Sequence, residues 1–150
     1  KRFMFVTDGY NFRNTEFGAV IGLSQLPRLD SMIERRREIC LWFKNYLKKH
    51  ENIFDIPEFD GNSSFCLPFI LKDKDKKTAL QNYLEDNGVE TRPLCSGNLL
   101  RQPFLKNYSM DVTNPEVDYL HFHGFFIGNN HLISESDISQ LEILLDNFLK

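Results

Sequence analysis

The stretch LDSMIERRREICLWFKNYLKK, residues 29–49, is the clearest fold signal in the chain because it predicts one long amphipathic helix. Its apolar side chains recur at helical spacing and form a single stripe: Leu29, Met32, Ile33, Cys40, Phe43 and Leu47. Charged side chains occupy the opposite face. Because Glu34 and Glu38 flank the arginines of ERRRE at i, i+4 distance, we interpret that run as an ion-paired, solvated face and not as a basic binding patch.

Upstream of this helix the chain predicts two further elements. The apolar run FMFVT, residues 3–7, is too short for a helix and is interpreted as a strand or an extended segment. Asn14 or Thr15 can then cap the start of a helix, and Pro27 ends it.

Downstream, segments that favour strands alternate with segments that favour helices. Residues 65–71, FCLPFIL, predict a strand in which Pro68 favours an edge position or a bulge. A helix is expected over residues 78–86, with the charged run KDKDKK leading into it and Asn87-Gly88 ending it. Residues 89–94 predict the next strand.

The last third of the chain completes the pattern. Residues 98–107 predict a short helical turn, and the second half of residues 117–130 predicts a strand. The final helix begins after Ser134, with Asp137 at the N3 position of a capping box. These elements predict an α+β domain of two layers, in which helices cover one side of a small, mostly antiparallel sheet.

Composition excludes several classes of protein. The 150 residues are 41% hydrophobic and 26% charged, which is typical of one globular domain. The formal net charge of −3 shows no basic excess, so neither a nucleic-acid partner nor a membrane-surface partner is expected. No apolar run reaches the length of a membrane span, and the first residues lack the features of a signal peptide.

The three cysteines, Cys40, Cys66 and Cys95, are odd in number and widely spaced, which favours a reducing, cytoplasmic setting. His121, His123 and His131 lie close together in sequence, and the HxH pair could place two metal ligands on a strand. No carboxylate or cysteine joins them at ligand spacing, so we predict no metal site and favour structural or substrate-facing histidines. Common hydrolase, zinc-protease and Walker motifs are absent from the sequence.

The segment DGYNFRNTEFGAVIGL, residues 8–23, raises the question of what Asn11 and Arg13 hold. An amide or a guanidinium near a helix start suits a phosphate dianion. From the residue types alone, the simpler interpretation is that Asn11 caps a turn and that Arg13 makes a surface ion pair.

Three blocks, in order, resemble the DegT-type family of pyridoxal-phosphate-dependent nucleotide-sugar aminotransferases. The first is GYNFRNTEFGAVIGLSQLPRLDSMIERRRE, which is similar to the family's GYN-x-R turn and the two helices that follow. The second, GVETRPLCSGNLLRQPFLKN, and the third, HGFFIGNNH, resemble the branch that contains ketosugar 3-dehydratases. The likeness runs over essentially the whole chain.

The resemblance implies that residues 1–150 are the C-terminal small domain plus the connecting helix of a fold-type I enzyme that binds pyridoxal phosphate. The family's large domain, which is absent here, carries the Asp that pairs with the pyridine nitrogen and the Schiff-base Lys, which the dehydratase branch replaces by His. Neither Lys44 nor Lys106 lies in a matching motif. We therefore predict no catalytic residue in this chain and no binding of the cofactor by this chain alone.

The resemblance also implies roles for individual residues. Asn11 occupies the position that reaches across a homodimer interface to the phosphate of the partner's cofactor, and Arg13 is a second candidate for cofactor binding. Arg92, Asn98 and His123 are candidates for binding the nucleotide-sugar substrate.

Three functions remain open at this point. The second and third blocks favour the C-terminal portion of a 3-dehydratase-like enzyme that acts on 4-keto-6-deoxy sugar nucleotides. A sugar aminotransferase of the same family is the alternative, and a stand-alone, non-catalytic binding module is another. Because Lys1 is not an initiator methionine and the chain starts inside a motif-bearing segment, we expect a piece of a longer protein.

Overall fold

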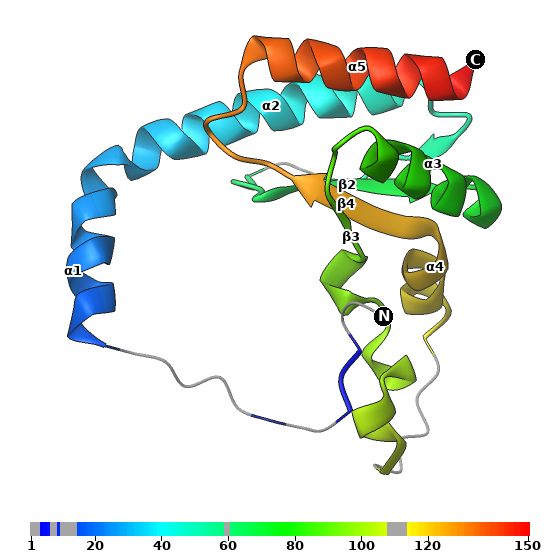
Figure 1. Cartoon of the computed structure of the whole chain (residues 1–150), viewed down its shortest axis with the longest axis horizontal. Helices are drawn as coiled ribbons and strands as arrows, with labels where there is room; N and C mark the ends of the chain where they lie inside the picture. The colour runs from blue at the N-terminus through cyan, green and yellow to red at the C-terminus, as the bar shows by residue number, and fades with distance from the viewer. Residues whose placement is uncertain (1–3, 7–8, 10–14, 59–60, 108–113) are drawn as a thin grey trace.

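The computed structural model describes residues 4–6, 9, 15–58, 61–107 and 114–150. Figure 1 shows a sheet with helices packed against it and one helix, α1, that projects away from the body. In chain order the elements are α1 Glu16–Gln25, η1 Leu26–Arg28, α2 Leu29–Lys49, β1 Phe54–Asp55, β2 Cys66–Leu71, α3 Lys74–Asp86, β3 Thr91–Arg92, η2 Leu94–Ser96, η3 Leu99–Arg101, η4 Pro103–Asn107, α4 Pro115–His123, β4 Gly124–Gly128 and α5 Glu135–Leu149, where η denotes a 3-10 helix.

The sheet is antiparallel, with strand order β1-β2-β4-β3. Burial alternates along β2: Leu67, Phe69 and Leu71 are buried, whereas the residues between them are half-buried. Because side chains alternate across a strand, the buried set points to one face, which α2, α3 and α5 cover. The predicted α+β architecture with helices on one side of the sheet is confirmed.

Aromatic rings dominate the core between the sheet and the helices. Phe69 stacks on Phe125 of β4 with ring centroids 5.0 Å apart. It also meets the edge of Phe43 of α2 at 4.8 Å and lies 5.8 Å from Phe54 of β1. Phe69 therefore links three strands and the longest helix of the described chain.

Pro68 occupies a locally open edge, as expected, although β2 as a whole lies between β1 and β4. Cys66 to Ile70 pair with Gly128 to Gly124 in continuous register. On its other side β2 pairs with β1 only through Ile70 and Leu71. At Pro68 the strand therefore has only one paired neighbour among the described strands, so a residue without an N–H is tolerated.

Two helices differ from the sequence expectation. α3 begins at Lys74 and not at Thr78, because Asp73 caps it by accepting from the N–H groups of Asp75 and Lys76. α4 occupies residues for which no helix was expected; Asn114 caps it and Pro115 stands in its first turn. His121 therefore lies on a helix, which corrects the idea of an HxH pair on a strand.

The N-terminal segments agree with expectation where they are described. Thr15 caps α1 through the N–H of Gly18, and α1 ends before Pro27. Met4 to Val6 form no strand, but Phe5 is held by Gln102 Oε1 and by the N–H of Phe104. The motif residues Asn11 and Arg13 lie outside the described residues.

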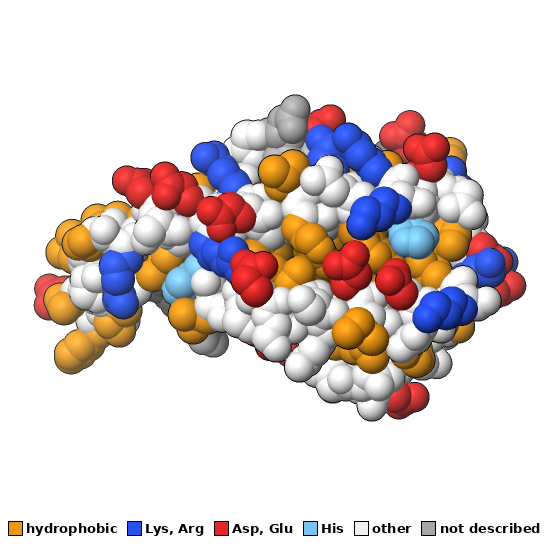
Figure 2. All heavy atoms as spheres, turned by 90° about the horizontal axis from the view of Figure 1, so that it is seen from above, with side chains coloured by type: hydrophobic (Ala, Val, Ile, Leu, Met, Phe, Trp, Pro, Cys, Tyr) orange, Lys and Arg blue, Asp and Glu red, His pale blue; other side chains and the backbone are white. Residues whose placement is uncertain are grey.

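The apolar side of α1 is exposed. Phe17 is 84% exposed, and Val20 and Ile21 are both exposed as well. Figure 2 shows hydrophobic side chains gathered on the projecting end of the molecule, whereas charged side chains are spread over the rest of that view. None of the described helices is both long enough and apolar enough to cross a membrane.

The ion-paired face that the sequence predicts for the ERRRE run is met at Arg35. Arg35 pairs with Glu38 at 3.0 Å and with Glu135 of α5 at 2.8 Å. Arg36 differs, because its Nε is buried and makes no hydrogen bond within the described residues. Asn129 lies next to this stretch and donates to the carbonyl of Arg36 at 3.0 Å. This helix face is therefore partly buried against the end of β4.

Candidate functional site

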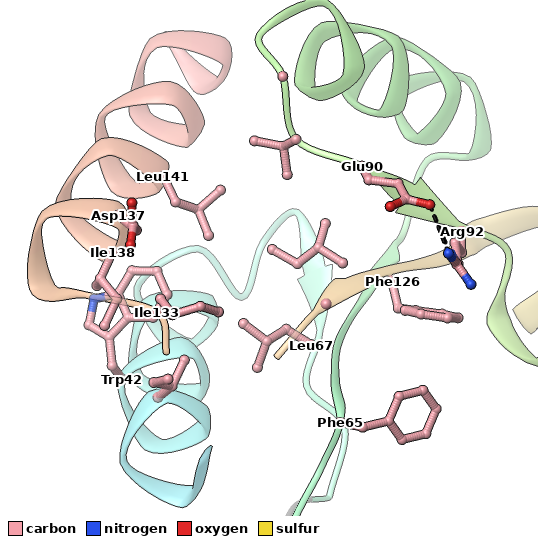
Figure 3. A pocket seen from close by; sticks show the side chains of 15 residues that line it. Trp42, Phe65, Leu67, Glu90, Arg92, Phe126, Ile133, Asp137, Ile138 and Leu141 are labelled. Atoms are coloured by element: carbon pink, nitrogen blue, oxygen red, sulfur yellow. Dashed lines mark hydrogen bonds and ion pairs between the residues drawn. The ribbon is translucent and has the colours of Figure 1, made fainter. Parts of the chain in front are cut away.

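A pocket opens between the two long helices and the β3 edge of the sheet (Figure 3). Its volume is about 470 Å³. Trp42 of α2 and Leu141 of α5 form one wall, and Phe65, Phe126 and Arg92 lie on the opposite side. Its lining is mainly apolar, which suits the flat or aliphatic part of a small molecule better than a highly charged group.

Arg92 lies at the mouth of this pocket. Its Nε and Nη2 donate to Oε1 of Glu90 at 3.1 and 2.9 Å (Figure 3). β3 places Arg92 there because Thr91, its neighbour, is buried and pairs with Ile127 of β4. Adjacent residues of a strand point to opposite faces, so the arginine side chain is directed outward.

A turn of unusual backbone geometry follows β3. Cys95 has φ 44°, Ser96 has φ 67° and Gly97 has φ 77°. Left-handed backbone at a non-glycine residue costs on the order of 1 kcal/mol or more and persists only where surrounding contacts enforce it. Such contacts are present: the N–H of Gly97 donates to Leu94 O at 2.6 Å, and Gln102 Nε2 donates to Ser96 O at 3.1 Å.

α4 supplies the remaining support for residues 95–98, which we call the 95–98 turn. The N–H of Asn98 donates to Nδ1 of His121 at 3.0 Å. The His121 ring also fills the space that a Cβ on Gly97 would need, so only glycine fits there. The Asn98 side chain donates to Asp118 at 2.8 Å and accepts from the N–H of Leu100.

Asp118 is the charged centre of this network. It accepts from Arg101 Nε at 2.7 Å and from Arg101 Nη2 at 2.9 Å, in addition to Asn98. The hydrogen bond from Arg101 is the main reason that the pKa of Asp118 falls to about 2. Burial lowers the pKa of His121 below its ordinary 6.5, and the nearby cations Arg101 and Lys77 lower it further.

The predicted site residues thus have different environments. Arg92 borders the pocket, whereas Asn98 is 5% exposed and has its side chain engaged within the turn. His123 faces away from the turn: its Nδ1 lies 2.7 Å from Leu71 O, and its ring stacks on Tyr119 at 4.1 Å. Arg92 thus lies at the end of β3, and the 95–98 turn follows it in the chain. His123 instead packs against Leu71 of β2.

His121 and His123 point in different directions because residues two apart on a helix do not share a face. Among the described residues no group of three or more histidines, cysteines and carboxylates could hold a metal ion.

Sequence reasoning missed the roles of Asp118 and His121. Asp118 and His121 are spaced i, i+3, a spacing that brings two side chains together on a helix, and recognising α4 would have paired them. The signal for α4 was Asn114-Pro115, a cap followed by a proline at the first helical position.

The described chain is thus a small α+β domain. Arg92 of β3 borders a mainly apolar pocket, and the 95–98 turn that follows β3 is supported by α4. Residues 1–135 match the DegT/DnrJ/EryC1/StrS aminotransferase family, and the chain belongs to this family.

Two of the proteins that this chain resembles are named as 3-dehydratases. The chain is 36% identical, over 99% of its length, to GDP-4-keto-6-deoxy-D-mannose 3-dehydratase of Yersinia pseudotuberculosis, and it covers 38% of that protein. A solved structure of the E. coli enzyme of that name, with bound hydrated PLP, superposes with a TM-score of 0.77 at 32% identity, over 95% of this chain and 38% of that one.

An aminotransferase of Psychrobacter cryohalolentis shares the fold, with a TM-score of 0.80 at 18% identity over 94% of this chain and 40% of that one. The chain therefore spans less than half the length of each of these relatives.

Proposed function

We propose that this chain is the C-terminal small domain, with its connecting helix, of an enzyme that dehydrates a 4-keto-6-deoxy sugar nucleotide at C3. The observation that carries the proposal is the 36% identity to the Yersinia 3-dehydratase over 99% of this chain. Relatives of this name cover both the second and the third sequence block, including the 95–98 turn and its α4 support.

Pyridoxal phosphate is the cofactor that the family implies, and the described residues do not form a pocket for it. The pocket beside Arg92 is mainly apolar, and this arginine is engaged by Glu90. Lys44 lies 3.4 Å from Glu58, in an ion pair on the outer face of α2. We therefore propose that the cofactor binds in a large domain that this sequence does not include.

In this proposal the chain contributes to substrate binding through the shape of the 95–98 turn and the charge of Arg92. We propose that Arg92 and the 95–98 turn face the nucleotide sugar, with Asn98 acting through the geometry of the turn. A guanidinium is the side chain best suited to a diphosphate or to a sugar hydroxyl at the rim of such a site. His123 is the weaker of the substrate candidates, because its ring is occupied by Leu71 O and Tyr119.

Asn11 and Arg13 remain the candidates for contacting the phosphate of a partner subunit's cofactor in a homodimer. Both lie outside the described residues, so the proposal rests on the motif GYNFR alone.

A sugar aminotransferase is the second candidate, favoured by the family's own description. The two reactions differ in their products: C3 dehydration removes the C3 hydroxyl oxygen and keeps the keto group, whereas transamination keeps the C3 hydroxyl and replaces the keto oxygen by an amine. A stand-alone binding module is the third candidate, and it predicts that the native gene product is no longer than this domain.

The mass of the native gene product separates the module from the enzymes. A product near the 17.7 kDa of this chain would contradict the proposal, whereas one more than twice as large is expected. The chain alone is expected to form no specific lysine adduct with pyridoxal phosphate. Borohydride reduction followed by peptide mapping tests this, and one stoichiometrically labelled lysine in this chain would contradict it.

A further inference from the structure

The 95–98 turn has a titratable support that the proposed function does not require. Nδ1 of His121 accepts the N–H of Asn98 at 3.0 Å, so the ring must be unprotonated at Nδ1 for this hydrogen bond to exist. The same ring packs directly against Gly97, whose φ of 77° already demands glycine. A single imidazole therefore contacts two consecutive residues of the strained turn.

We propose that His121 is a positioning residue whose neutral imidazole holds the 95–98 turn in place and whose protonation releases it. An imidazolium has N–H groups at both nitrogens and offers no acceptor to the N–H of Asn98. Protonation would therefore place two donors face to face, next to the left-handed residues Cys95 and Ser96.

The charges around His121 favour the neutral ring at physiological pH. Arg101 of η3 and Lys77 of α3 both oppose protonation, and Asp118 of α4 favours it. Asp118 is itself bound by Arg101 and Asn98, so its charge is largely committed to those partners. Together with burial, this leaves the folded protein with a His121 pKa below 6.5.

The remaining contacts explain why release would stay local. Leu94 packs against Gly124 at the start of β4, and Gln102 holds Ser96 O at 3.1 Å. Arg101 remains paired with Asp118. Loss of the hydrogen bond from Asn98 to His121 therefore affects the turn alone, because the contacts of Leu94 and Gln102 stay in place. The sheet and the core need not open.

NMR titration of this chain tests the proposal directly. We expect His121 to carry its proton on Nε2 at neutral pH and to titrate below 6.5, with the amide signals of Gly97 and Asn98 moving at the same midpoint. Protonation at Nδ1 at neutral pH, or titration of His121 while those two amides stay still, would overturn it. This arm needs no variant, so no folding defect can obscure it.

Substitution provides the matched comparison. His121→Asn keeps an acceptor oxygen near the position of Nδ1 but does not titrate, so the turn amides should lose their acid transition. His131→Asn, in the loop after β4, should leave the transition intact. An acid transition that persists in His121→Asn would overturn the role assigned to His121.

A second arm, in the full-length enzyme, rests on the proposed function. The KM for the sugar nucleotide should rise about tenfold for each pH unit below the His121 pKa, because only molecules with an ordered turn bind substrate. His121→Asn should abolish this dependence. An unchanged KM despite the NMR transition would overturn the positioning role, whereas an enzyme that transaminates the sugar nucleotide and does not dehydrate it would overturn the proposed function alone.

Discussion

Arg101 binds both carboxylate oxygens of Asp118, at 2.7 Å from Nε and 2.9 Å from Nη2. This pair joins η3 to α4, and Arg101 also lies over the Phe122 ring at 4.8 Å. Arg101 and Asp118 are 17 residues apart in the chain, and their pairing fixes η3, which directly follows the 95–98 turn, to α4, which supports that turn.

Acid titration of Asp118 is the first prediction. Its pKa is about 2 in the folded chain and 3.8 in an unfolded one, so the stabilisation is complete above 3.8 and is lost as the pH falls toward 2. Carboxyl NMR should place the midpoint near 2, and Arg101→Gln should raise it toward 3.8. Arg37→Gln serves as the control, because the hydrogen bonds that Arg37 makes within the described residues run to the loop carbonyls of Gly61 and Asn62 and not to Asp118. An unmoved midpoint in Arg101→Gln would refute the assignment.

Core packing gives the second prediction. Phe69→Ala removes a fully buried ring that contacts Phe125, Phe43 and Phe54, and it should lower the free energy of unfolding by about 3 to 5 kcal/mol. Phe65→Ala, at a ring that is 70% exposed, should change it by less than about 1 kcal/mol. Urea unfolding monitored by circular dichroism measures both, and Phe69→Leu replaces the alanine variant if that one does not fold. Equal effects at the two positions would contradict this core.

The sequence predicted the elements whose signals are local. The capping box of α5 is present as expected: Ser134 accepts from the N–H of Asp137, and Asp137 accepts from the N–H of Ser134. Gly88, with φ 82°, ends α3 where Asn87-Gly88 was expected to end it. These features depend on neighbouring residues alone, so one sequence suffices to find them.

Features that depend on distant partners were missed. α4 is short and apolar on several sides, so periodicity did not distinguish it from the strand that follows. Only Thr91 and Arg92 of the expected strand at residues 89–94 pair with β4, because the chain then turns sharply at Cys95. Asn129 is buried between Ser64 O and Cys40, an arrangement that no local pattern encodes.

The exposed face of α1 gives the third prediction. Phe17, Val20 and Ile21 lie on a helix with no buried residue, so the isolated chain should self-associate through it. Sedimentation velocity should show a rising average mass with concentration. The double variant Phe17→Ser and Ile21→Ser should shift the chain toward monomer, and Leu132→Ser, which alters an exposed leucine outside α1, should not. A strict monomer at high concentration would contradict the prediction.

The product formed by the full-length enzyme tests the central claim most directly. The full-length protein, supplied with pyridoxal phosphate, L-glutamate and GDP-4-keto-6-deoxymannose, should yield a sugar nucleotide that lacks the C3 hydroxyl oxygen, keeps its keto group and gains no nitrogen, as measured by mass spectrometry. A product in which an amine replaces the keto oxygen, with the C3 hydroxyl retained, would contradict the dehydratase assignment and establish the aminotransferase instead.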